Sequence, residues 1–477
     1  MGTKKTKKDK EKKPQIDLRL EVKNFGPISK ADVEIKPLTM FIGPNNSGKS
    51  YLALLIHSVF SISDFSNNFL YNSSIKYRDK DVSKFIDNLN MESKNDIILP
   101  DNMVRIFIEN LFKELYSSNY EGLLSGLFSS SLKDLIQINN SSFSMKISKS
   151  KINTTLSYRN NEKKLRINNS LKLVPKIIFK YFEDKLSYKS NGDEILFNLN
   201  AARNNIHFYF NIAIRAFFYR SFPLSTYYLP AARSGLMQGH KTIVADAIYN
   251  ASFAGIKDSE EPKFSGAVAE FLSNLIKLPE KKGHFYDLAL EFEQELIHGE
   301  IILSSSDRPY PEIKYKFNDF EIPLQRASST VSEMAPLFLY LKYLIKTRDV
   351  LIIEEPESHL DLRNQTILAK YLVRLIRGGV YIIITTHSEY LFSQINNLLL
   401  LSKIKPEDRV TKYGYKKDDY LNPDELSAYV FKEDKKSGGF KTEKIKIYED
   451  GVMEDEFLYI HESLYDEYFE LQQDSDK

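Results

Sequence analysis

The feature that most constrains this chain is a glycine-rich segment near the N-terminus, residues 41–50, with the sequence FIGPNNSGKS. The apolar run 38–42 predicts a buried strand before this segment, and the run 51–60 predicts a helix after it. The segment fits the pattern G-x-x-x-x-G-K-[ST] of a phosphate-binding loop at Gly43, Gly48, Lys49 and Ser50. A chance glycine turn is the alternative, but such a turn needs neither the strand nor the helix.

In such a loop, backbone amides and two side chains carry the chemistry. Glycines let the N–H groups turn inward toward phosphates, and the start of the helix adds partial positive charge. Lys49 can reach the β- and γ-phosphates of a nucleotide, and Ser50 can ligate Mg²⁺. The predicted nucleotide-binding residues of this segment are Gly43, Pro44, Asn45, Asn46, Ser47, Gly48, Lys49, Ser50 and Tyr51.

Composition limits the class of protein. The length of 477 residues suggests about two or three domains. The hydrophobic fraction of 42% is sufficient for a sizeable core. The absence of cysteine excludes disulfides and thiolate chemistry. No apolar segment follows the basic N-terminus, so no signal peptide is expected. The most apolar stretch, 206–229, is broken by two arginines and a proline, so we expect a cytoplasmic protein that does not span a membrane.

The net charge of +2 conceals a basic tail. Residues 1–13 carry a net charge of +5 and the remainder −3, so we expect a disordered tail that is either solvated or in electrostatic contact with nucleic acid. Residues 208–220 contain aromatic side chains and arginines, which are typical of two structures. They could bind single-stranded nucleic acid, or they could form part of an ordinary core. DNA therefore stays an open partner.

Patterns before and after the loop predict the rest of the head and an insertion. Alternation over 18–22 and 31–35 predicts two strands joined by a turn. Residues 61–222 are rich in Asn, Ser, Lys and aromatics. They predict a mainly helical insertion with short strands over 141–168 and no long coiled coil.

The chain then returns to a strand over 225–229, followed by a mostly helical stretch over 242–296 and a β-hairpin over 313–324. Arg233 comes shortly after the strand. An arginine there can reach an anion in a site, or it can pair with a structural carboxylate, and the sequence leaves both open.

Three features suggest a second half of the site. Thr330 and Glu333 match a capping box, which predicts a helix N-terminus able to hold an anion or simply a capped helix. The buried strand 350–353 ends in Glu354 and Glu355, and paired carboxylates there suit metal binding and water activation. One more buried strand, 380–384, leads to His387, which can contact a γ-phosphate.

The order of these pieces resembles ABC-type ATPases of the RecF, SMC and OLD-like group. The resemblance lies in the opening LRLEVKNFGPISKADVEIKPLTMFIGPNNSGKS and in LIIEEPESHLD, and it covers roughly 17–60, 225–236 and 313–400. It implies an α/β fold, an ABC-type P-loop ATPase head with a mostly helical insertion between the Walker A and signature motifs. It also implies ATP and Mg²⁺ as cofactors.

The resemblance assigns roles by position. It makes Glu354 the Walker B metal carboxylate, together with Ser50 from Walker A. Glu355 becomes the catalytic base and His387 the switch histidine. Further nucleotide contacts come from the signature position at Ser328, Ser329 and Thr330, from Asp361 in the D-loop, and from Arg233.

The chain departs from the group in places. Glu354 stands where many ABC proteins have Asp, the signature lacks paired glycines, and Gln238 is only a weak Q-loop candidate. The predicted organisation is a disordered basic tail (1–13), the head's N-terminal lobe (14–60), the insertion (61–222), a return to the head (223–320), the remaining head motifs (321–430) and a C-terminal strand with an acidic helix (431–477).

The resemblance implies a homodimer with two ATP at its interface, and assembly beyond the dimer stays open. The first hypothesis is the ATPase subunit of a prokaryotic anti-phage defence system, similar to the ATPases of the PARIS and Septu systems. Such a subunit would control a separate nuclease or toxin effector. The alternative is a RecF-like DNA repair ATPase that clamps DNA.

Overall fold

A computed structural model describes most of the chain. It describes residues 18–72, 97–106, 109, 120–149, 152–162, 164–171, 176–180, 188–191, 194–198, 225–239, 265–304, 312–448 and 451–452. The predicted disordered tail, the aromatic cluster over 208–220 and the predicted acidic helix after 453 lie outside these residues.

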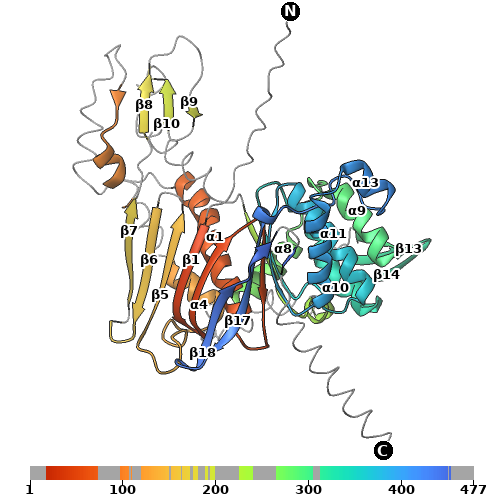
Figure 1. Cartoon of the computed structure of the whole chain (residues 1–477), viewed down its shortest axis with the longest axis horizontal. Coiled ribbons are helices and arrows are strands. Elements are labelled where there is room, and N and C mark those ends of the chain that lie inside the picture. The colour runs from red at the N-terminus through yellow and green to blue at the C-terminus, as the bar shows by residue number, and fades with distance from the viewer. Residues whose placement is uncertain are drawn as a thin grey trace, which may run out of the picture.

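A large mixed sheet organises the described residues (Figure 1). Five of its neighbouring strands are parallel, in the order β11 (Thr226–Leu229), β15 (Val350–Glu354), β16 (Tyr381–Thr386), β3 (Leu38–Ile42) and β17 (Leu426–Asp434). The sheet continues through β18 (Gly439–Lys444), β2 (Ile28–Ile35), β1 (Leu18–Phe25), β5 (Ser142–Lys149), β6 (Ile152–Arg159) and β7 (Lys164–Leu171). In this second part neighbouring strands are antiparallel except β18 and β2.

Helices cover both faces of this sheet. The described helices include α1 (Lys49–Asn72), α4 (Tyr120–Phe128), α8 (Gly266–Ile276), α9 (Tyr286–Ile297), α10 (Ser329–Tyr343), α11 (Leu362–Arg377), α12 (Glu389–Leu401) and α13 (Pro406–Thr411), with short 3-10 turns η1 (Leu324–Arg326) and η2 (Pro423–Glu425). None of these described helices is long and apolar enough to cross a membrane.

Three smaller sheets complete the described part. One contains β4 (Ile97–Ile98), β8 (Lys176–Lys180), β10 (Glu194–Asn198) and β9 (Tyr188–Asn191). Another contains β12 (Glu300–Ser304), β13 (Glu312–Phe317) and β14 (Phe320–Pro323). The last pairs β19 (Ile447–Tyr448) with β20 (Gly451–Val452).

Alternation along the central strands separates two hydrophobic cores. On β3, Phe41 packs into the core that contains α1, α4 and the strands β1 and β5. Met40 and Ile42 point to the opposite core, formed with α9 to α12. Burial on both faces explains why this strand is a continuous apolar run rather than an alternating one.

The structure confirms the α/β class and both predicted hairpins. Strands β1 and β2 turn through Asn24 and Gly26, which have φ of 56° and 54°. Strands β13 and β14 are joined by the predicted Asn318-Asp319 turn, in which Asn318 has φ of 51°. Asparagine and glycine are the residues that adopt this left-handed conformation most readily.

The described part of the insertion differs from the expectation of a mainly helical segment. It contains more strand than helix among its described residues. The alternation over 141–168 produces β5, β6 and β7, and β5 pairs with β1, so this part of the insertion extends the head's own sheet.

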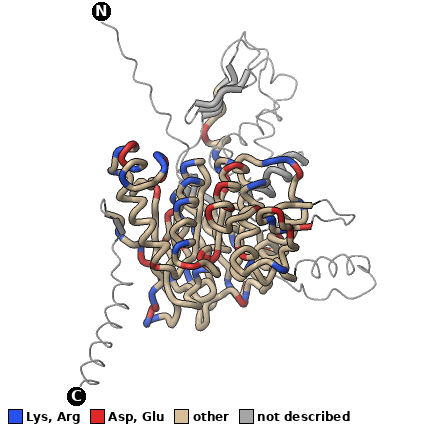
Figure 2. The backbone as a smooth tube through the Cα atoms, turned by 90° about the vertical axis from the view of Figure 1, so that its right-hand side faces the viewer, with Lys and Arg blue, Asp and Glu red and all other residues tan. Residues whose placement is uncertain are grey.

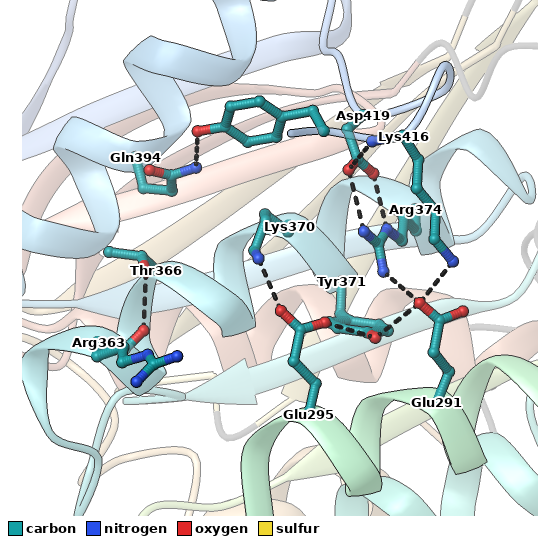
Figure 3. Close-up of polar contacts among 11 residues, drawn as sticks. Glu291, Glu295, Arg363, Thr366, Lys370, Tyr371, Arg374, Gln394, Lys416 and Asp419 are labelled. Atoms are coloured by element: carbon teal, nitrogen blue, oxygen red, sulfur yellow. Dashed lines mark hydrogen bonds and ion pairs between the residues drawn. The ribbon is translucent and has the colours of Figure 1, made fainter. Parts of the chain in front are cut away.

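A polar network joins α9, α11 and the segment 416–419 (Figure 3). Arg374 donates from Nε and Nη2 to Asp419 at 2.7 and 3.0 Å, and from Nη1 to Glu291 at 2.9 Å. Glu291 also accepts hydrogen bonds from Tyr371 at 3.0 Å and Lys416 at 2.5 Å. Because the Asp419 side chain is fully buried, Arg374 supplies the charge that makes its burial tolerable.

We therefore expect Arg374→Met to lower the free energy of unfolding by about 3 kcal/mol, since it leaves Asp419 buried and unpaired. Chemical denaturation measures this change. The matched control is Lys416→Met, which removes an exposed partner of the same network and should cost less than about 1 kcal/mol. Equal losses in the two variants would contradict this account of the network.

Candidate functional site

Three loop segments meet at one edge of the large sheet. Strands β3, β15 and β16 are parallel neighbours, so their carboxyl ends lie together. The phosphate-binding loop follows β3, the glutamates follow β15, and His387 follows β16. Ligands of open parallel sheets bind outside the carboxyl ends of the strands. The sequence-predicted halves of the site are thus brought to the same edge.

Two glycines give the phosphate-binding loop its backbone path. Gly43 has φ of 145° and Gly48 has φ of 98°. A Cβ atom on Gly43 would lie 2.9 Å from Cβ of Phe431, and one on Gly48 would lie 2.8 Å from Cγ1 of Ile28. Any larger residue at either position would force the loop away from the strands beneath it.

Lys49 begins α1 and folds back over the loop. Its Nζ donates to the carbonyl oxygens of Gly43 at 2.9 Å and Pro44 at 2.8 Å. Burial lowers the pKa of the Lys49 ammonium, and the nearby carboxylates of Glu355, Glu357 and Glu354 oppose that shift. The ammonium therefore lies in the electrostatic field of the carboxylates that follow β15.

The Glu354 carboxylate is nearly buried and held at both oxygens. Tyr228 donates its hydroxyl to Oε1 at 2.6 Å, and the backbone N–H of Ala231 donates to Oε2 at 3.1 Å. Burial, together with the neighbouring Glu354, raises the pKa of Tyr228 well above its ordinary value, so the phenol remains a donor. Sequence reasoning missed Tyr228, because a tyrosine in an apolar strand is usually a core residue.

Glu355 adopts a strained backbone conformation directly after β15. Its φ is 43°, which is costly for a residue with a side chain. Its N–H donates to the carbonyl of Thr385 at 2.9 Å. The carboxylate is 40% exposed, accepts a hydrogen bond from Ser358 at 3.3 Å and lies 3.8 Å from Nε2 of His387. The two predicted catalytic side chains are therefore neighbours.

Glu357 is a third carboxylate of the site that sequence reasoning did not single out. Its Oε1 accepts hydrogen bonds from the Thr386 hydroxyl at 2.7 Å and from the N–H of His387 at 2.8 Å. It thereby fixes the backbone that carries His387. The run EEPE contains this glutamate next to the predicted pair. Only the structure shows that Glu357 faces the end of β16.

Arg233 is placed inside the protein and not in the open part of the site. The residue is 1% exposed, and its Nη2 lies 2.9 Å from Oε1 of Glu333 on α10. Its Nη1 donates to the carbonyl of Glu354 at 2.6 Å, and Nη2 donates to that of Glu355 at 3.3 Å. The structure favours the second sequence interpretation, in which Arg233 pairs with a structural carboxylate.

The capping box predicted from Thr330 and Glu333 is wrong. The cap of α10 is Ser328, whose side chain accepts from the N–H of Val331, two residues earlier than predicted. Glu333 is drawn away from the helix start because it pairs with Arg233. The Thr330 hydroxyl donates instead to the carbonyl of His359 at 2.7 Å, linking the start of α10 to the predicted D-loop.

The remaining predicted residues lie around this edge. Ser328 and Ser329 are exposed at the start of α10, and Asp361 caps α11 by accepting from the N–H of Asn364 at 2.8 Å. Tyr51 is partly exposed on α1, with its ring 6.2 Å from that of Phe25. Gln238, the weak Q-loop candidate, is exposed in a helical stretch over 233–239.

The donor set fits a nucleotide with Mg²⁺. The Ser47 hydroxyl is buried in the loop without a hydrogen-bond partner in the described structure, as expected of a group reserved for a ligand. The hydroxyl of Ser50 and the carboxylate of Glu354 are hard oxygen ligands, which Mg²⁺ prefers. No group of three or more His, Cys, Asp or Glu residues in the described ranges could hold a metal alone.

Comparisons with known proteins give one family match. A family model described as "AAA ATPase domain" matches residues 18–392. No curated protein matches the chain. Similar solved structures include an SMC head bound to the C-winged helix domain of ScpA, at 11% identity and a TM-score of 0.42, covering 90% of this chain and 97% of that chain.

Two further SMC heads have the same identity of 11%. The SMC head domain from Thermotoga maritima has a TM-score of 0.34, with 90% of this chain and 98% of that chain covered. The Smc head domain with an extended coiled coil, bound to the C-terminal domain of ScpA and derived from Pyrococcus furiosus, has a TM-score of 0.38. That comparison covers 94% of this chain and 98% of that chain.

We expect Arg233→Met to lower the free energy of unfolding by about 3 to 5 kcal/mol without any nucleotide present, because Glu333 would be left buried and unpaired. Thermal and chemical denaturation of the nucleotide-free protein measure this change. The control is Arg326→Met at an exposed arginine of η1, which should be nearly neutral. A stable Arg233→Met protein with weakened nucleotide binding would restore the anion-binding interpretation.

The pKa of His387 should lie below its ordinary value of 6.5, because burial and then the Lys49 charge disfavour the imidazolium. Since the folded pKa is lowered, this group adds stability above its unfolded pKa and loses it as the pH falls through the folded pKa. NMR titration of the ring, assigned with His387→Gln, measures the midpoint. Lys49→Met should raise it, and a wild-type midpoint above 6.5 would contradict the described electrostatics.

Proposed function

The chain belongs to the AAA ATPase domain family, and from this premise we propose that it binds ATP with Mg²⁺ and hydrolyses ATP to ADP and phosphate. One observation carries the proposal: the phosphate-binding loop, the paired glutamates and His387 lie together at the carboxyl edge of the sheet. The family match and this topology agree with the α/β P-loop ATPase head expected from the sequence.

Each site residue has a proposed role in binding or hydrolysing ATP. Lys49 and the loop amides would bind the β- and γ-phosphates, and Ser50 with Glu354 would hold Mg²⁺, which neutralises phosphate charge when bound. Glu355 would take the proton of the attacking water, whose oxygen bonds to the γ-phosphorus while the bond to the ADP oxygen breaks. His387, neutral near pH 7, would hydrogen-bond the γ-phosphate.

We propose further that two copies close around the nucleotide. Supporting this, Ser328 and Ser329 are exposed at the start of α10, where they can meet a second copy although the Ser328 hydroxyl also caps its own helix. The bond from Thr330 to the His359 carbonyl ties that helix start to the segment that follows Glu355. ATP-dependent closing and opening would form a two-state switch.

The proposed role of the switch is to control a separate nuclease or toxin in a prokaryotic anti-phage defence system. In the one view of Figure 2, the charged residues of the described part of the chain do not gather on a single basic side of the kind that a DNA clamp uses. Figure 2 shows Lys and Arg interspersed with Asp and Glu over the described part of the chain in that view. The basic tail 1–13 is the observation that keeps the RecF-like DNA clamp as the second candidate.

Glu355→Gln tests the proposal. We expect hydrolysis to fall by about 100- to 10,000-fold, because the variant cannot accept the proton, while ATP binding is retained. Phosphate release and equilibrium binding measure the two effects, and light scattering with ATP and Mg²⁺ should show a trapped dimer. Glu407→Gln, at an exposed carboxylate of α13, is the matched control.

Unchanged hydrolysis in Glu355→Gln would remove the catalytic assignment, and a monomer with ATP bound would remove the dimer. Capture of the tagged variant from its native operon context then separates the two roles. A co-purifying nuclease or toxin supports the defence switch. DNA alone, with DNA-stimulated hydrolysis in the wild type, supports the clamp.

A further inference from the structure

We propose that Tyr228 is a positioning residue that orients the Glu354 carboxylate for Mg²⁺, and that His57 and Glu270 tie this contact to helix α8. The inference rests on the ATPase function proposed above. It adds to that function a device that couples the metal site to an element away from the nucleotide-binding edge.

Two hydrogen-bond donors hold the Glu354 carboxylate. Oε1 of Glu354 accepts the Tyr228 hydroxyl at 2.6 Å, and Oε2 accepts the N–H of Ala231 at 3.1 Å. Each carboxylate oxygen can accept a second interaction, so both oxygens stay available to a metal or its waters. The two donors therefore fix the orientation of the carboxylate and leave lone pairs on both of its oxygens available to a metal.

The Tyr228 ring is held in place by its packing against His57. Tyr228 is buried on β11, and its ring packs against the ring of His57, with centroids 5.4 Å apart and planes at 40°. His57 lies on α1, the helix that starts at Lys49. The tyrosine hydroxyl can reach Glu354 only while this ring keeps its place.

A contact with Glu270 connects His57 to helix α8. Its Nε2 lies 3.0 Å from Oε2 of Glu270, while its Nδ1 is buried without a partner in the described structure. Helix α8 itself is closely seated, because a Cβ atom on Gly266 would lie 2.7 Å from the carbonyl oxygen of Gly126 near the end of α4. A shift of α8 would therefore act on His57, then on Tyr228, and then on the Glu354 carboxylate.

A purely structural tyrosine would also satisfy a buried carboxylate, so the test must report on the metal. The probe is Mn²⁺, titrated by EPR into protein saturated with the non-hydrolysable analogue AMP-PNP. Hydrogen-bond partners of metal ligands are typically worth about 10- to 100-fold in metal affinity. Tyr228→Phe, which keeps the ring and loses the hydroxyl, should weaken Mn²⁺ binding by that factor. Metal-free binding of AMP-PNP should not change.

The matched control is Tyr429→Phe. It removes another buried tyrosine hydroxyl, which accepts from the N–H of Glu34 at 2.6 Å in the adjoining part of the sheet. Its Mn²⁺ affinity should equal that of the wild type. A second variant, Glu270→Leu, leaves Tyr228 and Glu354 intact and removes the Glu270 contact of His57, whose Nε2 also lies 3.4 Å from the Ser61 hydroxyl. This variant should weaken Mn²⁺ binding by roughly 5-fold through the coupling, and the control Glu280→Leu on the exposed segment after α8 should not.

Unchanged Mn²⁺ affinity in Tyr228→Phe would overturn the positioning role, and unchanged affinity in Glu270→Leu would overturn the link to α8. If Tyr228→Phe does not fold, the Glu270→Leu comparison still tests the link from α8 to the metal site. Failure of the wild type to bind AMP-PNP with Mn²⁺ would instead defeat the ATPase proposal, which is a distinguishable result.

Discussion

The parallel pairing of β3, β15 and β16 is the constraint on which the site depends. Backbone hydrogen bonds align Ile42 with Thr386 and Glu354 with Thr385, so three segments far apart in the sequence end at one edge. Both faces of these strands are buried, and a register slip would move apolar side chains from one core to the other. The packing of the two cores therefore fixes the relative positions of the nucleotide-binding loop and the acidic turn.

A buried ion pair supports the strained part of this edge. Glu355 has φ of 43° and His359 has φ of 61°, and such conformations persist only where the surroundings enforce them. Arg233 binds the carbonyls of Glu354 and Glu355 and pairs with Glu333 of α10. The same arginine thus braces the acidic turn and connects it to the helix whose first residues are proposed to meet a second copy.

The sequence was sufficient wherever a short pattern decides the structure. The strand, loop and helix around Lys49 and the turn at Asn318 follow from local periodicity and from residues that favour positive φ. It was insufficient where the partner is distant in the chain. Glu333 looked like a capping residue, yet it pairs with an arginine 100 positions earlier. Tyr228 and Glu357 were not singled out from the sequence, because only the sheet register brings them to Glu354 and His387.

Hydrogen exchange of the wild-type protein with and without ATP and Mg²⁺ tests the central claim most directly, since it follows all three segments in one measurement. The account predicts that exchange slows together in the peptides covering 43–50, 354–361 and 385–388, because one bound nucleotide contacts the edge that they share. Protection limited to one of these segments, or found only elsewhere in the chain, would contradict a single nucleotide site built from the three strand ends.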